Sequence, residues 1–216
     1  MKKNRIYFVV WMMVLTGLGW HRGLAVELTR GDSGLEEMLN GLERKISGYE
    51  SREIQFLEER IFAFRKQPIE LEGIIRIDKK AGLSISYPKK KVLIIADEVG
   101  VLMRRFSEDG SFVQRVGNEE QSGTIQLMAA ALQFDRAVLA EVFELSLEMK
   151  EGDWVITMVP INEDMGSIEM VEMHGIGDVL SLIEMTMRGH QKIRIKPGEE
   201  RLDVVFSEEE LSRFFR

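Results

Sequence analysis

Residues 151–160, EGDWVITMVP, decide the fold that the sequence predicts. A polar turn leads into a strand from Trp154 to Pro160, which ends there because proline lacks the N–H that a central strand donates. Side chains alternate across a strand, so Trp154, Ile156 and Met158 share one apolar face. The residues before this strand are interpreted as one half of a sheet with its helices. The residues after it are interpreted as returning hairpins of the same sheet.

Residues 1–25 have the three-part layout of a secretory signal peptide. A basic start precedes an uncharged and largely apolar run, residues 6–20, and small side chains follow at a cleavage position. The alternative is an uncleaved membrane anchor, but the run is shorter than the roughly 20 apolar residues that span a bilayer comfortably. We therefore predict cleavage after Ala25, export of the chain, and one mature domain over residues 26–216.

Composition narrows the classes of function. The chain carries a net charge of −7, and its predicted signal region contains only basic charged residues, so the mature domain is more acidic still. An acidic protein repels phosphates, so we expect no nucleic acid among its partners. The chain contains no cysteine, so we expect neither disulfides nor thiol chemistry.

Groups that would indicate catalysis or a metal site are few. Two histidines, His174 and His190, follow the signal region. Both are predicted on turns, where a histidine usually faces solvent. No zinc-protease motif, no hydrolase nucleophile elbow and no P-loop occurs in the sequence. We therefore expect a protein that is not an enzyme and needs no cofactor or metal.

Hydrophobic periodicity predicts about ten strands and three or four helices. Helices are expected around Leu35 to Ile46, in two segments over residues 124–146, and after Ser207, which opens a capping box. Residues 27–34 are expected to form a flexible N-terminus. The strands are expected from Arg52 onward, and the last two of them are separated by a turn at Pro197-Gly198. The apolar run Val92 to Ala96 is expected as a central strand covered on both faces.

The order of these elements predicts the fold class. Helices come before the strands or inside the strand run, and they do not alternate with single strands. This order argues against a parallel α/β fold and predicts an α+β fold, a large curved antiparallel sheet with helices packed on one face. A sheet that curls around its own helices can leave a pocket of lipid size between them.

Apolar strand residues are the candidates for lining such a pocket, and the alternative is that they form an ordinary packed core. The flexible methionines among them suit a surface that must fit variable apolar shapes. Arg60 and Arg76 are expected on solvated strand faces, with a polar contact to a helical lid as the alternative. The candidate lining residues are Phe56, Phe62, Phe64, Ile75, Ile77, Leu83, Ile85, Met103, Trp154, Ile156 and Met158.

The order of elements resembles the LolA-like family of periplasmic lipoprotein carriers, and the resemblance extends over the predicted mature chain. It implies an unclosed, strongly curved antiparallel half-barrel with helices as a lid over a hydrophobic cavity. The segments that carry it are the helix around Leu35 to Ile46, the Phe56 strand, Pro68 with Leu71-Glu72-Gly73, Tyr87-Pro88, the Asp109-Gly110 turn, the helical insertion, Trp154 to Pro160, and the strands around His174-Gly175 and Arg188-Gly189.

Members of this family bind the acyl chains of lipoproteins released from the inner membrane and carry them across the periplasm. The resemblance therefore implies a monomeric periplasmic carrier whose partners are an acylated lipoprotein, an inner-membrane release complex and an outer-membrane acceptor. One stretch departs from the family pattern, because Leu83 to Pro88 is followed by three lysines and is not rich in aromatic residues. Three hypotheses stay open: a lipoprotein carrier, a carrier or sensor for another acylated lipid, and an enzyme that uses scattered acids on a lipid.

Overall fold

The computed structural model describes residues 26–28, 33–46, 48–97, 100–116, 130–161, 167–177 and 179–216. The predicted signal peptide lies outside these residues, and so does most of the first helical segment expected after residue 124. Among the helices that are described, none combines the length and the apolar character needed to cross a membrane.

The described chain forms one twelve-stranded sheet, with helices at its start, middle and end. The helical segments are α1 (Ser33–Ile46), the 3-10 turn η1 (Pro88–Lys90), α3 (Arg136–Val142) and α4 (Glu208–Phe215). The strands are β1 (Val26–Leu28), β2 (Ser51–Ile61), β3 (Ile69–Asp78), β4 (Gly82–Tyr87), β5 (Val92–Ala96), β6 (Val101–Phe106), β7 (Phe112–Val116), β8 (Phe143–Lys150), β9 (Asp153–Pro160), β10 (Ile168–Ile176), β11 (Val179–Met187) and β12 (Gln191–Leu202).

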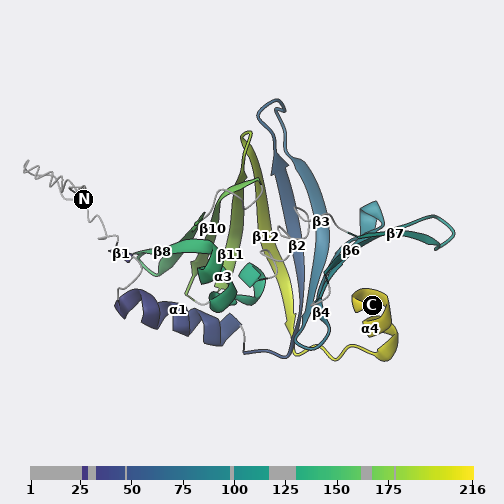
Figure 1. Ribbon diagram of the computed structural model, residues 1–216, viewed down its shortest axis with the longest axis horizontal. Helices are drawn as coiled ribbons and strands as arrows, with labels where there is room; N and C mark the ends of the chain where they lie inside the picture. Colours follow the sequence, from purple (N-terminus) through teal and green to yellow (C-terminus); the bar gives the residue numbers. More distant parts are fainter. Residues whose placement is uncertain are drawn as a thin grey trace, which may run out of the picture.

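The sheet is antiparallel throughout and open. Its strand order is β1-β8-β9-β10-β11-β12-β2-β3-β4-β5-β6-β7, so β12 and β2 join the late and early parts of the chain near the middle of the sheet. The two edges, β1 and β7, lie at opposite ends of this order. Figure 1 shows the strands curving between these edges into an unclosed half-barrel. The structure thus confirms the predicted curved antiparallel fold.

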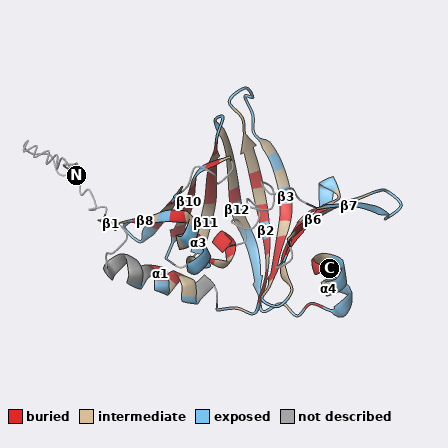
Figure 2. Cartoon of the chain, in the orientation of Figure 1, coloured by how far each residue is buried: buried red, intermediate tan, exposed pale blue. Residues whose placement is uncertain are grey.

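Alternation gives every strand an inner, concave face and an outer face. On the inner face Ile54 lies opposite Ile75, which lies opposite Ile85 on the next strand. These residues belong to one buried apolar cluster, which also contains Leu39 of α1 and Leu139 of α3. The two helices therefore cover the concave face. Figure 2 shows buried residues along the middle of the strands, whereas the hairpin ends and β7 are exposed.

Two glycines on the inner face lie directly opposite aromatic residues. Gly73 pairs with Phe56 across β2 and β3, and Gly175 pairs with Trp154 across β9 and β10. A Cβ atom built on either glycine would overlap the facing ring. Each ring therefore covers its neighbouring strand, an arrangement that suits a tightly curved sheet.

The helix α4 lies on the opposite side of the sheet from α1 and α3. Its N-terminus has the predicted capping box, because Ser207 Oγ accepts a hydrogen bond from Glu210 N (3.2 Å) and Glu210 Oε2 accepts one from Ser207 N (2.8 Å). The helix packs against β4 and β5 and covers Leu93 and Ile95 on their outer face. The prediction that all helices pack on one face is therefore wrong for α4.

Three predicted elements differ in the structure. Residues 27 and 28, part of the segment 27–34 that was expected to be flexible, form with Val26 the edge strand β1 on β8. Residues 143–150, expected as helix up to residue 146, form β8, since Phe143 ends the helical spacing and begins an alternating run. The expected turn at Pro197-Gly198 is a shift in register within β12, which continues to Leu202.

Two smaller predictions also fail in the later strands. His174 lies within β10, paired with Val155 and Leu182, and not on a turn. The alternation in β11 predicts one shared face for Val179, Ser181, Ile183, Met185 and Met187. A shift in register near Leu180 breaks this face, because it turns Leu180 toward the core and leaves Val179 exposed.

Candidate functional site

The candidate site is the apolar concave face and the helical cover above it. The structure brings together most of the residues predicted to line it. Phe56, Ile75, Ile77, Leu83, Ile85, Trp154, Ile156 and Met158 all belong to the single buried cluster. Met103 is half-buried on β6, opposite Ile94, which packs against that cluster.

Phe62 and Phe64 lie beyond the end of the strand that carries Phe56. The strand β2 ends at Ile61, and the chain then turns, with Arg65 N donating to the carbonyl of Phe62 (3.0 Å). Phe64 is 87% exposed, and its ring packs only against Phe62 among the aromatic contacts described (5.3 Å between centroids). Phe64 therefore points to solvent, because the alternation seen in the sequence continues past the end of the strand, whereas Phe62 is half-buried and its place in the lining stays a prediction.

The cover consists of α1, residues 130–134 and α3. Its apolar side chains include Leu42, Leu132 and Phe134, which lie in the same cluster as the strand residues. The turn before α3 is held by Asp135 N, which donates to the carbonyl of Ala130 (2.8 Å). Asp135 also caps α3, as predicted, by accepting a hydrogen bond from Val138 N (3.2 Å). The cover is therefore an ordered structure that packs against the apolar face of the sheet.

A buried arginine fastens this cover to the sheet. Arg52 shares the inner face of β2 with Ile54, and its Nη1 donates to the carbonyl of Leu132 in the cover (3.3 Å). Its Nε and Nη2 reach one carboxylate oxygen of Glu200 on β12, at 2.6 and 2.5 Å. A buried charge needs such partners to offset its lost hydration. Arg52 thus links the cover to two central strands.

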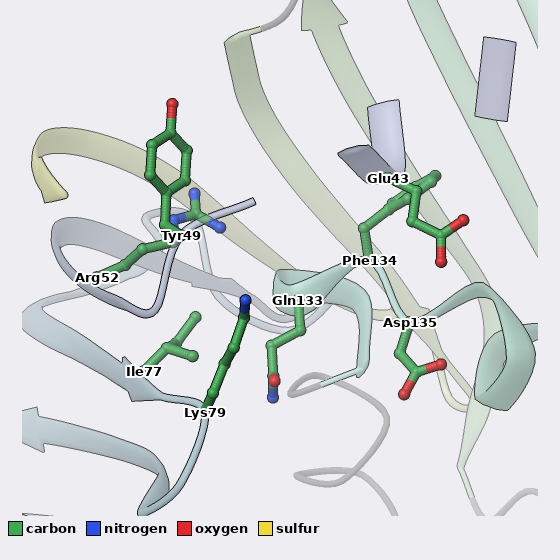
Figure 3. Close-up of a pocket in the computed structure, with 8 residues that line it drawn as sticks. All are labelled: Glu43, Tyr49, Arg52, Ile77, Lys79, Gln133, Phe134 and Asp135. Atoms are coloured by element: carbon green, nitrogen blue, oxygen red, sulfur yellow. The ribbon is translucent and has the colours of Figure 1, made fainter. Parts of the chain in front are cut away.

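Two cavities flank Arg52. The larger, of about 280 Å3, lies at the junction of α1 with β2 and is rimmed by polar groups (Figure 3). In Figure 3 the side chains of Tyr49, Arg52 and Lys79 lie to one side of Gln133 in the cover, and that of Asp135 lies to the other. The complete lining is Glu43, Tyr49, Arg52, Ile77, Lys79, Gln133, Phe134 and Asp135.

The smaller cavity, of about 150 Å3, is more enclosed and more apolar. It reaches from Ile54, Phe56 and Leu132 to the seam between β11 and β12. Pairing between these two strands ends at Ile183 and Ile195, so the strands separate beyond that point. The sheet therefore has an opening into its apolar interior, next to Arg52.

A second polar group lies on the inner face. The hydroxyl of Tyr87 donates to the buried carboxylate of Glu58, which also accepts a hydrogen bond from Arg60. Burial, together with the negative charge of Glu58, raises the pKa of the Tyr87 hydroxyl well above its ordinary value. Tyr87 is therefore a neutral donor at physiological pH. The expectation of a solvated strand face is wrong for Arg60, which is half-buried in this cluster.

Sequence analysis did not identify Arg52 or Glu58 as candidate residues. Both share the inner side of β2 with Ile54 and Phe56, so alternation was the signal that could have identified them as inner-face residues. In the described part of the chain, no group of three or more histidine, cysteine or acidic residues is placed to hold a metal ion.

Comparisons with known proteins find no matching family model and no matching curated protein. Solved structures of similar fold include a DUF1329 family protein from Desulfovibrio piger, with 9% identity and a TM-score of 0.44, covering 84% of this chain and 98% of that one. They also include an outer membrane lipoprotein-sorting protein domain from Vibrio parahaemolyticus, with 6% identity and a TM-score of 0.35, covering 82% and 95%. At these values neither likeness assigns the chain to a family, and the resemblance drawn from the sequence stays a prediction.

Proposed function

We propose that this chain is a periplasmic carrier that holds the acyl chains of lipoproteins between its concave face and its helical cover. On this proposal it takes its cargo from an inner-membrane release complex and delivers it to an outer-membrane acceptor, as a monomer and without catalysis. The observation that supports it best is an apolar concave face closed by a cover to which the buried Arg52 is hydrogen-bonded.

The energetics suit a reversible carrier. Burying about fifteen methylenes at ~0.8 kcal/mol each contributes on the order of 10 kcal/mol before the entropic costs of binding. The apolar cavity of about 150 Å3 is smaller than the roughly 300–1,000 Å3 typical of ligand pockets, so the cover must move to admit an acyl chain. An acyl chain that takes the place of the cover replaces apolar contacts with apolar contacts, which keeps release possible.

Arg52 is the residue through which we expect this motion to be controlled. Its hydrogen bond to Leu132 exists only while the cover is closed, and Glu200, its partner on the sheet, keeps it in place. Replacing Arg52 by methionine keeps much of its length and removes the bond to the cover. Glu200 is partly exposed and can turn toward water when Arg52 is absent. Arg52→Met is therefore expected to loosen the cover while the sheet stays folded.

The first test is mass spectrometry of an organic extract of protein purified from its native periplasm, which would also separate a lipoprotein from another acylated lipid. The second is titration with a fluorescent fatty acid. We expect the unmodified chain to bind it and Arg52→Met to release it several-fold faster. Arg201→Met, a change at an exposed arginine paired with Glu53, is the matched control and should leave release unchanged. If no lipid copurifies and no fatty acid binds, the proposal is wrong.

A further inference from the structure

A separate pocket lies on the outer face of the sheet, away from the covered concave side and its two cavities. It has a volume of about 340 Å3 and lies between α4 and the strands β3, β4 and β5 (Figure 1 shows α4 beside this end of the sheet). Its walls are apolar on several sides, formed by Ile74, Leu93, Phe106 and Phe214. Arg76, Lys91 and Arg213 also line it, and no acidic residue does. The pocket thus combines an apolar interior with an excess of positive charge.

The helix that forms one wall is firmly placed. Its capping box satisfies the first backbone N–H groups, and Phe215 is buried against Phe206 (5.4 Å between ring centroids). Leu93 and Ile95 are buried on the strand face beneath it. The pocket is consequently part of the packed structure of this face and not a gap under a loose terminus.

Arg76 supplies the fixed charge of the pocket. It is only 7% exposed, which corrects the expectation of a solvated strand position. Its guanidinium lies 3.9 Å from the ring centroid of Phe214, and it donates to Glu53 (2.8 Å) and to the hydroxyl of Ser86 (3.0 Å). Glu53 is shared with Arg201 (3.1 Å), so one carboxylate faces two guanidinium groups. Glu210 of α4 also attracts Arg76 electrostatically, so two carboxylates outside the pocket lining offset part of the positive charge of the pocket.

Two further cations are accessible at the pocket. Lys91 pairs with Glu108, a residue that is 95% exposed, and an exposed pair of this kind contributes about 0–1 kcal/mol. An incoming anion can replace Glu108 at little cost. Arg213 is exposed on α4, with its guanidinium 5.4 Å from the Phe214 ring centroid. Burial lowers the pKa of Arg76 against the opposing effects of Glu53 and Glu210, and the charge of Arg213 lowers it further.

We propose that this outer pocket binds an amphipathic anion, a phosphate or carboxylate joined to a short apolar group. The anionic group would lie among Lys91, Arg213 and the edge of Arg76, since guanidinium and ammonium groups both bind such oxygens. The apolar group would lie against Leu93 and Phe214. The volume, at the lower end for small-molecule sites, limits the ligand to a short chain or a single ring.

The experiment is a calorimetric titration of the folded chain with octyl phosphate below its micelle concentration, with inorganic phosphate and octanol as the two halves of the probe. We expect octyl phosphate to bind at least tenfold more tightly than either half. The test variant is Lys91→Gln with Arg213→Gln, and we expect it to weaken binding at least tenfold. The control is Lys89→Gln with Arg216→Gln, which removes the same net charge from neighbouring positions outside the pocket and should change binding less than twofold.

The comparison of the two double variants separates this site from the concave face. If octyl phosphate bound to the concave face instead, both double variants would bind it with equal affinity. Equal weakening in both variants would overturn the proposal, since it would show a response to net charge alone. Binding to anionic phospholipid vesicles without binding to free octyl phosphate would also overturn it, in favour of a membrane-contact surface. Arg213→Gln alone, at an exposed position, provides a second test in which folding is not at risk, and it should weaken binding several-fold.

Discussion

The pair formed by Trp154 and Gly175 allows a quantitative test of how the concave face is built. Trp154 is 2% exposed, and its indole Nε1 donates to the carbonyl of Gly177 (2.9 Å). Its ring covers Gly175 so closely that a Cβ atom there would lie under 3.0 Å from two ring carbons and 2.6 Å from the carbonyl oxygen of Val179. The perturbations are Trp154→Ala, Gly175→Ala and the two together.

The expected magnitudes follow from these contacts. Trp154→Ala should cost about 3–5 kcal/mol of unfolding free energy, as for other buried aromatic residues. Gly175→Ala should cost about 3 kcal/mol, the upper part of the range for overpacking, because one obstructing atom is backbone. In the absence of the indole the new methyl group has space on one side, and only the overlap with Val179 persists. The two changes should therefore couple by about 1–2 kcal/mol.

Urea and thermal unfolding of the four proteins measure this coupling. For a domain of this size each kcal/mol corresponds to about 2–4 °C in Tm, so Trp154→Ala should lower Tm by roughly 6–20 °C. Gly41→Ala is the matched control, since Gly41 lies in α1 with no atom near its Cβ position, and alanine there should be neutral or stabilising by up to about 1 kcal/mol. If Gly175→Ala costs the same with and without the indole, the ring does not cover the glycine and the reasoning fails.

Two further predictions concern single side chains. Burial alone would raise the pKa of Glu184, but hydrogen bonds from Lys192 and Arg194 more than offset it, so the pKa lies below its ordinary value. A lowered carboxyl pKa contributes stability above the unfolded pKa of about 4.3 and loses it as the pH falls through the folded pKa. Glu184→Gln should therefore lower the unfolding free energy at pH 7, and this difference should shrink below about pH 4; a constant difference from pH 7 to pH 3 would contradict it. Phe64→Ser should change the unfolding free energy by no more than about 0.5 kcal/mol and leave fatty-acid binding unchanged, whereas a loss above 1 kcal/mol in thermal melts would show that the exposed ring is structural.

The inner face was predictable from the sequence because alternation is a local property. Trp154, Ile156 and Met158 are buried together, as their spacing indicates. Local spacing was misleading at Phe143, because this residue fits both the helical spacing of the segment before it and the alternation of the strand after it. Only the pairing of β8 with β9 decides between the two, and no local pattern contains that information.

Pro197 shows a different limit. A proline followed by glycine is an ordinary turn signal, yet β12 continues through it. The pairing of β12 with β11 ends at Ile195, before the proline. Pro197 therefore interrupts no hydrogen bonds between these two strands. In place of a turn, Pro197-Gly198 produces a shift in register between β12 and β2, and both residues line the apolar cavity beside this point.

The charged residues of the two sites depend on contacts between distant parts of the chain. Arg52 meets Glu200 across 148 positions, and Arg76 meets Phe214 across a similar span. A single arginine in a strand looks like a solvated residue until its partners are known. For this reason the sequence could predict the apolar part of the concave face but neither the contact of Arg52 with Glu200 nor that of Arg76 with Phe214.

The distribution of contacts also predicts which part of the molecule would move in the proposed carrier. Each half of the sheet has an aromatic ring that covers a facing glycine, Phe56 over Gly73 and Trp154 over Gly175. The two halves are joined by the pairing of β12 with β2, which contains one shift in register. Packed interfaces of this kind resist small deformations. The cover joins the sheet through apolar packing, the bonds of Arg52, and the end of α3, where Ile161 N donates to the carbonyl of Val142 (2.9 Å) and the chain continues into β8. The bonds of Arg52 can be broken without disturbing any strand pair. Changes at the aromatic–glycine pairs should thus act on stability, and changes at Arg52 on the rate of ligand entry and release. A variant of Trp154 that altered release of a fatty acid without lowering Tm would place the motion in the sheet instead.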